Sequence, residues 1–488
     1  MRQDPSRIPV IVGVGEINDR PPDASQALNS LQLMLTALTA ADRDGGGRWL
    51  ERCDRILVVP QLSFSEIDVP QGLSEATGLD RADIREAEVP SGDTPVRLLN
   101  DAANAIGAGE ATVCAVIGAE AMRTALRTGK PLFPNARKNA SELRRRYGLL
   151  QPSDIYPLYE NAFRAAEKQT LAEGQAETGR IWSLMSEVAA GSDGAWLRGP
   201  RTPEEIVEPT ADNRPIAFPY TKLMVANASV NQGAAIIVTS LAAALEAGVP
   251  EKQLVYIGAG AAAHEAHEAM ARPEWTAPTG MQVAIEETLS RNGLSGEDLD
   301  HVELYSCFPC VPKMVSRVLG WPADRPATVH GGLTFGGGPV ANYMGHAIAA
   351  MVRKLRNQGR TGFVFGNGGF CEHNHCIVLS RTPLAKVSFP QEYDAQAIAD
   401  ARRGPVPVLT DAIEGDFPIE TYTVIYGRDG EPQHGIVLSR TSEGMRVIAK
   451  VEASDARSLA FLTDGRTEPV GKLGQNRRSG DDLIWTAL

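Results

Sequence analysis

The sequence predicts an α/β protein built from two similar halves and followed by a small antiparallel β domain. Three observations support this prediction. Short apolar strands alternate with amphipathic helices in the first part of the chain, and the same order returns between about residues 280 and 380. From Glu420 onward, the pattern changes to short alternating strands with turns between them, which is typical of a small antiparallel β domain.

The first half has the order strand, helix, strand, helix, strand. Leucines at helical spacing predict a helix within residues 24–41. A second helix is expected at 95–108, because Asp93 or Thr94 supplies an N-cap, Pro95 suits the first turn and Gly109 ends the pattern. Continuous apolar runs predict strands at 7–13, 55–60 and 112–118.

The second half repeats this order. Its expected helices lie at 280–291 and 347–358, and its expected strands lie at 301–305, 362–365 and 376–379. Such a repeat predicts a duplicated architecture with buried, parallel or mixed sheets. Periodicity alone fits two unrelated α/β domains equally well.

Changes of composition suggest the domain boundaries. A charged, helix-rich segment over about 123–222 interrupts the first half and is expected to form a loop domain. Residues 404–407 read as a linker before the tail, which we expect to fold independently. The predicted domains are an N-terminal half over 1–245, a C-terminal half over 246–385 and an additional β domain over 405–488.

The bulk composition excludes several classes of protein. A formal net charge of -12 argues against binding to nucleic acid or to anionic membranes, which requires clustered Lys and Arg. No run approaches the roughly 18 apolar residues of a membrane helix, and the first residues lack a signal-peptide core, so a cytoplasmic location is expected. Six cysteines in 488 residues are too few for a disulfide scaffold.

Five short motifs occur in the two predicted halves. The longest, residues 336–346 (GGGPVANYMGH), is a Gly-rich turn that ends in Gly-His. Two others follow predicted strands of the second half, at 305–308 (YSCF) and 366–368 (GNG). The last two, at 118–122 (GAEAM) and 231–235 (NQGAA), lie in the first half.

Together these motifs resemble those of thiolases over about residues 7–383. YSCF resembles the His-Asp-Cys-Phe block of sterol-carrier-protein thiolases, and GNG resembles their Gly-x-Gly. With the appended tail, the chain looks like a thiolase-like protein type 1. The resemblance implies a duplicated thiolase fold, acyltransferase activity in lipid metabolism, and coenzyme A thioesters as substrate or ligand with no other cofactor. It also implies a homodimer, although the extra domain leaves a monomer open.

The resemblance places the thiolase nucleophile at a position that lacks cysteine. Alignment through the helix at 95–108 puts that position on Gly92, with Ser91 beside it. A serine needs a positioned base, whereas a cysteine thiolate is nucleophilic near neutral pH. Thiolytic acyl transfer is therefore in doubt, and we expect Gly92→Cys to restore a reactive thiol that faces the catalytic residues.

His346 and Cys307 are the candidate catalytic residues. A neutral His346 at the start of a helix would donate a hydrogen bond to a thioester oxygen as negative charge develops there. Cys307 would move a proton at the α-carbon, provided that a neighbour favours its thiolate. Each residue also has a structural interpretation, as a turn-capping histidine or a buried cysteine.

Several other residues belong to the expected site. Those that the resemblance assigns to the substrate cavity are Gly366, Gly368, Tyr305 and Tyr343. The basic residues expected to bind the phosphates of coenzyme A are Arg144, Arg145 and Lys222, although a solvated charged surface explains them equally well. The segment 371–376 (CEHNHC) superficially resembles a metal cluster, but zinc ligands normally come from separate segments, so no metal is expected.

Two further functions remain open beside acyl transfer. Steroid side-chain aldolases also resemble thiolases, and retro-aldol cleavage needs a base and an enolate-stabilising pocket but no acyl acceptor. The missing cysteine favours this lyase. The other alternative is a non-catalytic acyl-CoA-binding scaffold whose tail recruits a partner.

Overall fold

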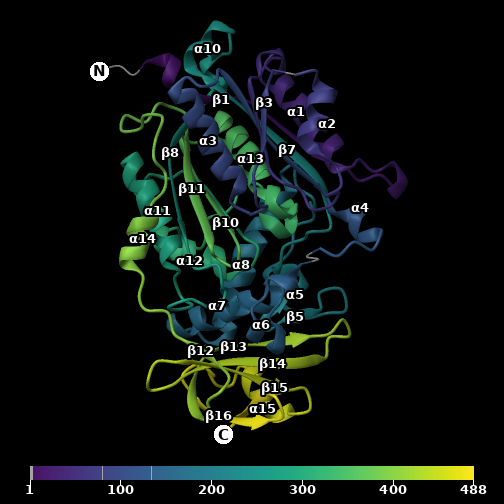
Figure 1. Cartoon of the computed structure of the whole chain (residues 1–488), viewed down its shortest axis with the longest axis vertical. Coiled ribbons are helices and arrows are strands. Elements are labelled where there is room, and N and C mark those ends of the chain that lie inside the picture. The colour runs from purple at the N-terminus through teal and green to yellow at the C-terminus, as the bar shows by residue number, and fades with distance from the viewer. Residues whose placement is uncertain (1–3, 80, 133–134) are drawn as a thin grey trace.

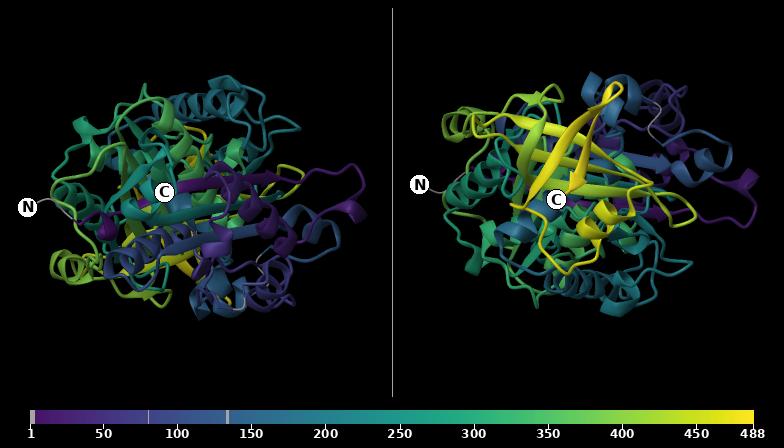
Figure 2. Two further views of the ribbon diagram at one scale, coloured as in Figure 1. Left: turned by 90° about the horizontal axis from the view of Figure 1, so that it is seen from above. Right: turned by 90° about the horizontal axis from the view of Figure 1, so that it is seen from below.

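The structure is a computed structural model that describes residues 4–79, 81–132 and 135–488. A large α/β part forms one end of the elongated molecule, a helical segment follows it, and the C-terminal strands form the other end (Figure 1). Seen from below, the C-terminal strands lie across that end of the molecule (Figure 2).

Within the described residues, the α/β part is built on one mixed sheet with the order β3-β2-β4-β7-β1-β8-β11-β10-β9. Its strands are β1 (Pro9–Asn18), β2 (Arg55–Val58), β3 (Asp83–Glu86), β4 (Val113–Ala121), β7 (Asn231–Ser240), β8 (Val255–His264), β9 (His301–Leu304), β10 (Thr361–Gly368) and β11 (His373–Ser380). The two halves meet where β1 pairs with β8 through Val10 and Ile11. Each half thus contributes one side of a continuous sheet.

The sheet confirms the predicted duplication. In the first half, β1 is antiparallel to β7, β7 is antiparallel to β4, and β4 is parallel to β2. In the second half, β8, β11, β10 and β9 repeat the same three relations in the same order. Only β3, at the edge of the first half, has no counterpart among the described strands of the second.

Two helices in equivalent positions form the centre of the fold. They are α3 (Thr94–Ala108), which follows β3, and α13 (Tyr343–Asn357), which follows β9. Both helices contact the sheet and each other, and most of their residues are buried. The other helices of the α/β part are α1 (Ser30–Asp44), α2 (Val69–Thr77), α10 (Leu241–Glu246), α11 (Thr279–Asn292), α12 (Cys310–Leu319) and α14 (Gln396–Arg402). His346 therefore lies in the first turn of one central helix, Gly92 lies just before the other, and Cys307 lies between β9 and α12.

The segment between β4 and β7 is helical, as expected. Its helices are α4 (Met122–Arg127), α5 (Ala136–Asn139), α6 (Glu142–Tyr147), α7 (Pro152–Ala166), α8 (Leu171–Ala190) and α9 (Pro203–Val207). It also contains two short strands, β5 (Pro215–Ala217) and β6 (Tyr220–Thr221). In Figure 1 these helices lie between the large sheet and the C-terminal strands.

The tail is rich in strands, as predicted, but differs in detail. Its elements are β12 (Leu409–Thr410), β13 (Gly415–Tyr426), β14 (Pro432–Arg440), β15 (Arg446–Glu452), α15 (Ala456–Thr463), β16 (Leu473–Ser479) and β17 (Asp482–Ala487). Two pairings, β12 with β15 and β15 with β17, are parallel, and α15 was not anticipated. β5 of the loop segment pairs with β13, so the second sheet extends into the first half. In the part of the chain that the structure describes, no helix is long and apolar enough to cross a membrane.

Candidate functional site

The turn before α3 leaves no space for a nucleophile at Gly92. A Cβ atom on Gly92 would lie 2.1 Å from the backbone oxygen of Asn367 and 2.4 Å from the hydroxyl of Tyr305. The φ angle of Gly92 lies outside the left-handed region, so space and not backbone conformation requires glycine here. The neighbouring Ser91 hydroxyl donates a hydrogen bond to the Asp93 carboxylate.

The predicted cavity glycines are part of the same close contact. A Cβ on Gly368 would lie 2.1 Å from the Ser91 oxygen, and one on Gly366 would lie 2.9 Å from the Cα of Asp93. The end of β10 therefore packs directly on the turn before α3. The Gly-x-Gly pattern of 366–368 is explained by this backbone approach.

A row of ring contacts leads from this turn to His346. The Tyr305 and Tyr343 rings meet edge to face with centroids 6.0 Å apart, Tyr343 and His330 lie 5.8 Å apart, and His330 and His346 lie 5.6 Å apart. The structure thus places Tyr305 beside Gly92, whereas His346 contacts the turn only through intervening rings. Burial, together with Cys307, raises the pKa of Tyr305 well above its usual range, so its hydroxyl stays protonated and can donate a hydrogen bond.

Glu303 connects the tyrosines to the loop that carries His330. Its carboxylate accepts hydrogen bonds from the Tyr343 hydroxyl at 2.6 Å, the Thr328 hydroxyl at 2.8 Å and the backbone N–H of Val329 at 2.8 Å. Burial raises its pKa to about 7, although these hydrogen bonds oppose the shift. A carboxyl group with this pKa exchanges its proton near neutral pH.

Replacing Glu303 with glutamine is expected to flatten the pH dependence of stability. Because the pKa of Glu303 is raised from 4.5 to about 7 in the folded protein, its contribution is fully present below the unfolded pKa. That contribution is lost as pH rises through about 7, and it amounts to up to about 3 kcal/mol. Denaturant unfolding between pH 5 and pH 8 should therefore show a smaller loss of stability in Glu303→Gln than in wild type. The exposed Glu246→Gln should keep the wild-type slope, and an unchanged slope in Glu303→Gln would contradict the expectation.

The environment of Cys307 does not favour a thiolate. The side chain is buried, and burial raises the pKa of its thiol to about 12, against the effect of a hydrogen bond with Tyr156. Backbone hydrogen bonds at Cys307 and Phe308 also oppose the rise but do not outweigh burial, and α12 begins only at Cys310. Cys307 is therefore a thiol at neutral pH and cannot serve directly as a base.

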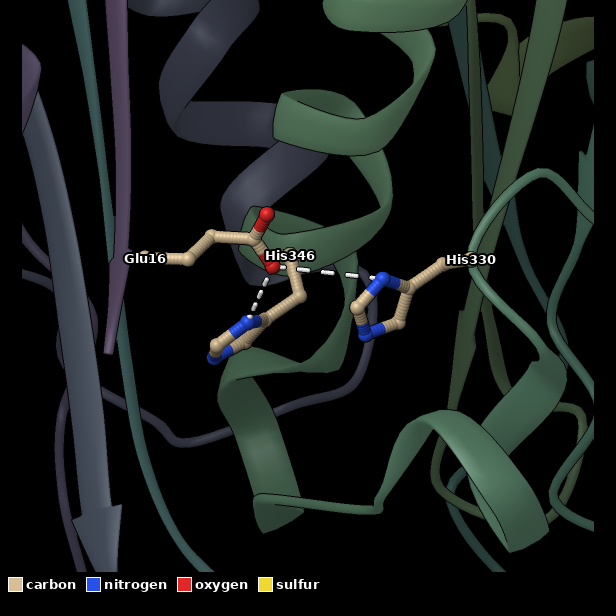
Figure 3. A group of neighbouring side chains, drawn as sticks. All are labelled: Glu16, His330 and His346. Carbon is tan, nitrogen blue, oxygen red and sulfur yellow. Dashed lines mark hydrogen bonds and ion pairs between the residues drawn. The ribbon is translucent and has the colours of Figure 1, made fainter. Parts of the chain in front are cut away.

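His346 belongs to a buried ionic cluster that the sequence did not indicate. Its Nδ1 lies 2.7 Å from a carboxylate oxygen of Glu16 on β1, and the other oxygen binds the Arg353 guanidinium. His330 approaches from a third segment, with its Nδ1 3.9 Å from the same Glu16 oxygen (Figure 3). Although burial opposes ionisation of Glu16, its hydrogen bond with His346 and the nearby positive charges hold its pKa well below the usual range.

This arrangement orients the ring of His346. Because Glu16 is ionised and can only accept a hydrogen bond, Nδ1 of His346 is the donor in this contact. Among the described residues, Nε2 of the same ring has no hydrogen-bond partner. Nε2 is therefore the atom of His346 that is left for a substrate, and its catalytic role stays a prediction.

The three expected phosphate-binding residues differ in accessibility. Arg144 is 4% exposed, donates to the backbone oxygen of Leu149 and lies over the Phe370 ring, so its guanidinium is engaged within the protein. Arg145 and Lys222 are exposed. Each of these two side chains donates one hydrogen bond to a backbone oxygen, Arg145 to Ala140 and Lys222 to Asp212, but both remain accessible to a large anion.

Residues 371–376 do not converge on one point. The His373 ring meets His264, with their Nδ1 atoms 3.1 Å apart, whereas the buried His375 packs on Tyr393 with centroids 4.8 Å apart. Among the described residues, the one group whose ligand atoms lie close enough together to hold a metal ion is formed by Glu16, His330 and His346 instead.

The whole chain is similar to one solved structure of known family. This is the monomeric SCP2-thiolase-like protein type 1 from Mycobacterium smegmatis, with 30% sequence identity and a TM-score of 0.84, covering 100% of both chains. The chain belongs to this family. Residues 397–481 also match the family model of the thiolase-like protein type 1 additional C-terminal domain. No curated protein sequence matches the chain.

More distant structures share the thiolase fold with this type 1 SCP2-thiolase-like protein. The Ltp2-ChsH2(DUF35) aldolase has 18% identity and a TM-score of 0.62, covering 76% of this chain and 97% of that one. Human mitochondrial 3-ketoacyl-CoA thiolase in complex with CoA has 15% identity and a TM-score of 0.58, covering 77% of this chain and 98% of that one. At these identities, the comparison shows the fold alone.

Sequence reasoning missed three polar residues of this SCP2-thiolase-like site. They are Glu16, His330 and Glu303. Glu303 lies within the predicted strand 301–305, and a carboxylate in a buried strand is a signal that a partner must be present. Glu16 lies beyond the predicted strand 7–13, in the part of β1 that the sequence did not indicate. His330 precedes a Gly-Gly pair and carried no signal of its own.

Proposed function

We propose that this protein binds an acyl-CoA thioester and acts on it without a covalent acyl-enzyme. The observation that carries the proposal is the contact at Gly92, where the backbone of Asn367 and the hydroxyl of Tyr305 fill the space that a nucleophile would need. Membership of the SCP2-thiolase-like family supports a thioester ligand, and the human thiolase of the same fold was solved with CoA bound. Acyl transfer of the thiolase type would require another nucleophile.

The chemistry that this site supports best is proton transfer at the thioester. Tyr305 occupies the place of the nucleophile as a protonated phenol, so it is suited to donate a hydrogen bond to an oxygen of the substrate. Tyr343 and Glu303 lie behind it and supply a group that exchanges protons near pH 7. This favours a retro-aldol or related lyase reaction over thiolysis, and the fold shared with an aldolase is consistent with it.

The nucleotide of coenzyme A is proposed to lie against the loop segment. Arg145 and Lys222 are the exposed basic residues of the predicted set, and arginine and lysine side chains bind phosphate oxygens through charge-assisted hydrogen bonds. Arg144 is assigned a structural role beside Phe370. These placements can be tested by comparing an acyl-CoA, which carries the nucleotide, with an acyl-pantetheine thioester, which lacks it.

A panel of acyl-CoA species tests the proposal. We expect calorimetry to show binding, intact-protein mass spectrometry to show no acyl adduct, and product analysis to show cleavage of a β-hydroxyacyl-CoA. Arg145→Glu with Lys222→Glu should weaken acyl-CoA binding at least about tenfold and leave an acyl-pantetheine thioester unaffected, whereas the exposed Lys252→Glu should change neither.

Three results would separate the alternatives. An acyl adduct on Ser91 would restore a thiolase mechanism and contradict the proposal. Binding without any product would identify a scaffold. If no CoA species bound at millimolar concentration, the protein would not act on CoA thioesters.

A further inference from the structure

Three segments that are distant in the sequence meet at a buried group of one carboxylate and two imidazoles. Glu16 extends from β1, His346 from the first turn of α13, and His330 from the loop before the π-helix η7 (Gly332–Gly336) (Figure 3). The two histidines are 0% exposed, and the Glu16 side chain is 5% exposed. One ligand-capable atom from each residue lies within 4.8 Å of the others.

Hydrogen bonding within the protein leaves this group incomplete. Neither nitrogen of His330 has a hydrogen-bond partner, and neither does Nε2 of His346. A buried polar atom without a partner costs about 1–3 kcal/mol, so native proteins rarely retain several at one place. Ion pairing explains why Glu16 contacts His346 and Arg353. It does not explain why the His330 imidazole is buried beside them.

We propose that Glu16, His330 and His346 bind one divalent transition-metal ion of the zinc class. A carboxylate with two imidazoles is a ligand set that suits zinc and its neighbours in the first transition row, and three protein ligands leave a fourth position for water. Because ligand atoms lie about 2.0–2.2 Å from zinc, two of them at a tetrahedral ion are about 3.3 Å apart. The separations from the Glu16 oxygen, 2.7 Å to Nδ1 of His346 and 3.9 Å to Nδ1 of His330, lie on either side of that value. An ion bound at Nδ1 of His346 would replace the hydrogen that this nitrogen shares with Glu16.

Arg353 is the competing cation at this site. Its guanidinium binds the second oxygen of Glu16, but 43% of its side chain is exposed, so it can turn toward solvent when an ion enters. The structure thus places a replaceable surface charge and not a second buried cation against the carboxylate. Removing that charge should strengthen the binding of a dication.

Titration of chelator-treated protein tests the site. We expect one Zn²⁺ per chain by calorimetry, a higher melting temperature with Zn²⁺, and a visible d–d spectrum with Co²⁺. His330→Ala and Glu16→Gln should each weaken binding at least about a hundredfold, which exceeds the usual effect of losing an outer-shell partner. His330→Gln, which keeps the size of the side chain, serves as a second variant if His330→Ala folds poorly. Arg353→Gln should tighten binding about tenfold.

The matched control is His267→Ala, because the His267 side chain is 87% exposed and represents adventitious binding by a surface histidine. It should leave affinity and spectrum unchanged. The proposal is overturned by the absence of stoichiometric binding, by affinity that His330→Ala and His330→Gln do not alter, or by an intense thiolate charge-transfer band that places Co²⁺ on the cysteines. The test does not depend on the proposed thioester chemistry, since no acyl-CoA is present.

Discussion

Replacement of Gly92 by cysteine is expected to destabilise the protein and to give no acyl-enzyme. From the sequence, the position before α3 suggested a thiolate that the helix dipole would activate. In the structure, the added Cβ would overlap the backbone oxygen of Asn367 at 2.1 Å and the ring of Tyr305 at 2.6 Å. Contacts below 3.0 Å force atoms to move, and the Asn367 oxygen belongs to a paired strand that cannot move alone.

The expected loss is about 3 kcal/mol, the upper end of the range for overpacked positions. Urea unfolding of Gly92→Cys and Gly92→Ala measures it, and both variants should lose stability because the Cβ is common to them. Gly199→Cys is the matched control, since a Cβ on Gly199 has no atom within 4 Å. It should unfold close to wild type.

Adding Tyr305→Ala to Gly92→Cys sharpens the test. This second change removes the contact with the phenol but keeps the contact with the Asn367 backbone, and it also leaves a cavity in the core. The double variant should therefore lose less stability than the sum of the losses of Gly92→Cys and Tyr305→Ala measured separately. A stable Gly92→Cys that gains an acyl mass adduct from acetyl-CoA would contradict this account and would show that only the nucleophile had been lost from a thiolase site.

The fold was predictable because its signals are local. Apolar runs and helical spacing predicted six strands of the large sheet and the helices α1, α3, α11 and α13, and the order of these elements predicted the duplication that the sheet confirms. The strands β3, β7 and β8 were not predicted. The parallel pairings of β15 and the strand that β5 adds to β13 depend on contacts between distant segments, so no local pattern indicated them.

The candidate site was predictable only in part for the same reason. The glycines at 366 and 368 came from a motif, and the structure explains them by the approach of β10 to the turn before α3. By contrast, the partner of His346 lies 330 residues away on β1, and His330 comes from a third segment. The metal interpretation of residues 371–376 was rejected on their spacing, whereas the group that does converge is spread over three elements.

Replacement of Arg446 by methionine is the second variant with a large expected effect. The sequence predicts that residues 405–488 fold independently, yet Arg446 in β15 is 0% exposed and connects the tail to the second half. Its guanidinium donates to both carboxylate oxygens of Glu420, at 2.6 and 2.8 Å, and to the backbone oxygens of Met270 and Arg272, at 2.8 and 2.9 Å. Ile436, Leu438 and Ile448 of the tail also belong to the main apolar core.

Arg446→Met keeps the apolar stem but leaves two backbone oxygens and part of the Glu420 charge without a donor. We expect a loss of about 3–5 kcal/mol, as for other buried charges that lose a partner. Arg440→Met is the matched control, because Arg440 binds the same Glu420 but its side chain is 30% exposed, so it should cost about 1 kcal/mol or less.

Chemical unfolding followed by limited proteolysis at residues 404–408 distinguishes two outcomes. Cleavage there with loss of the whole fold would show that the tail and the α/β part are one cooperative unit, whereas a cleaved tail beside an intact α/β part would show that the tail is attached mainly through Arg446. A loss below 1 kcal/mol would mean that the tail does not depend on this contact and folds by itself.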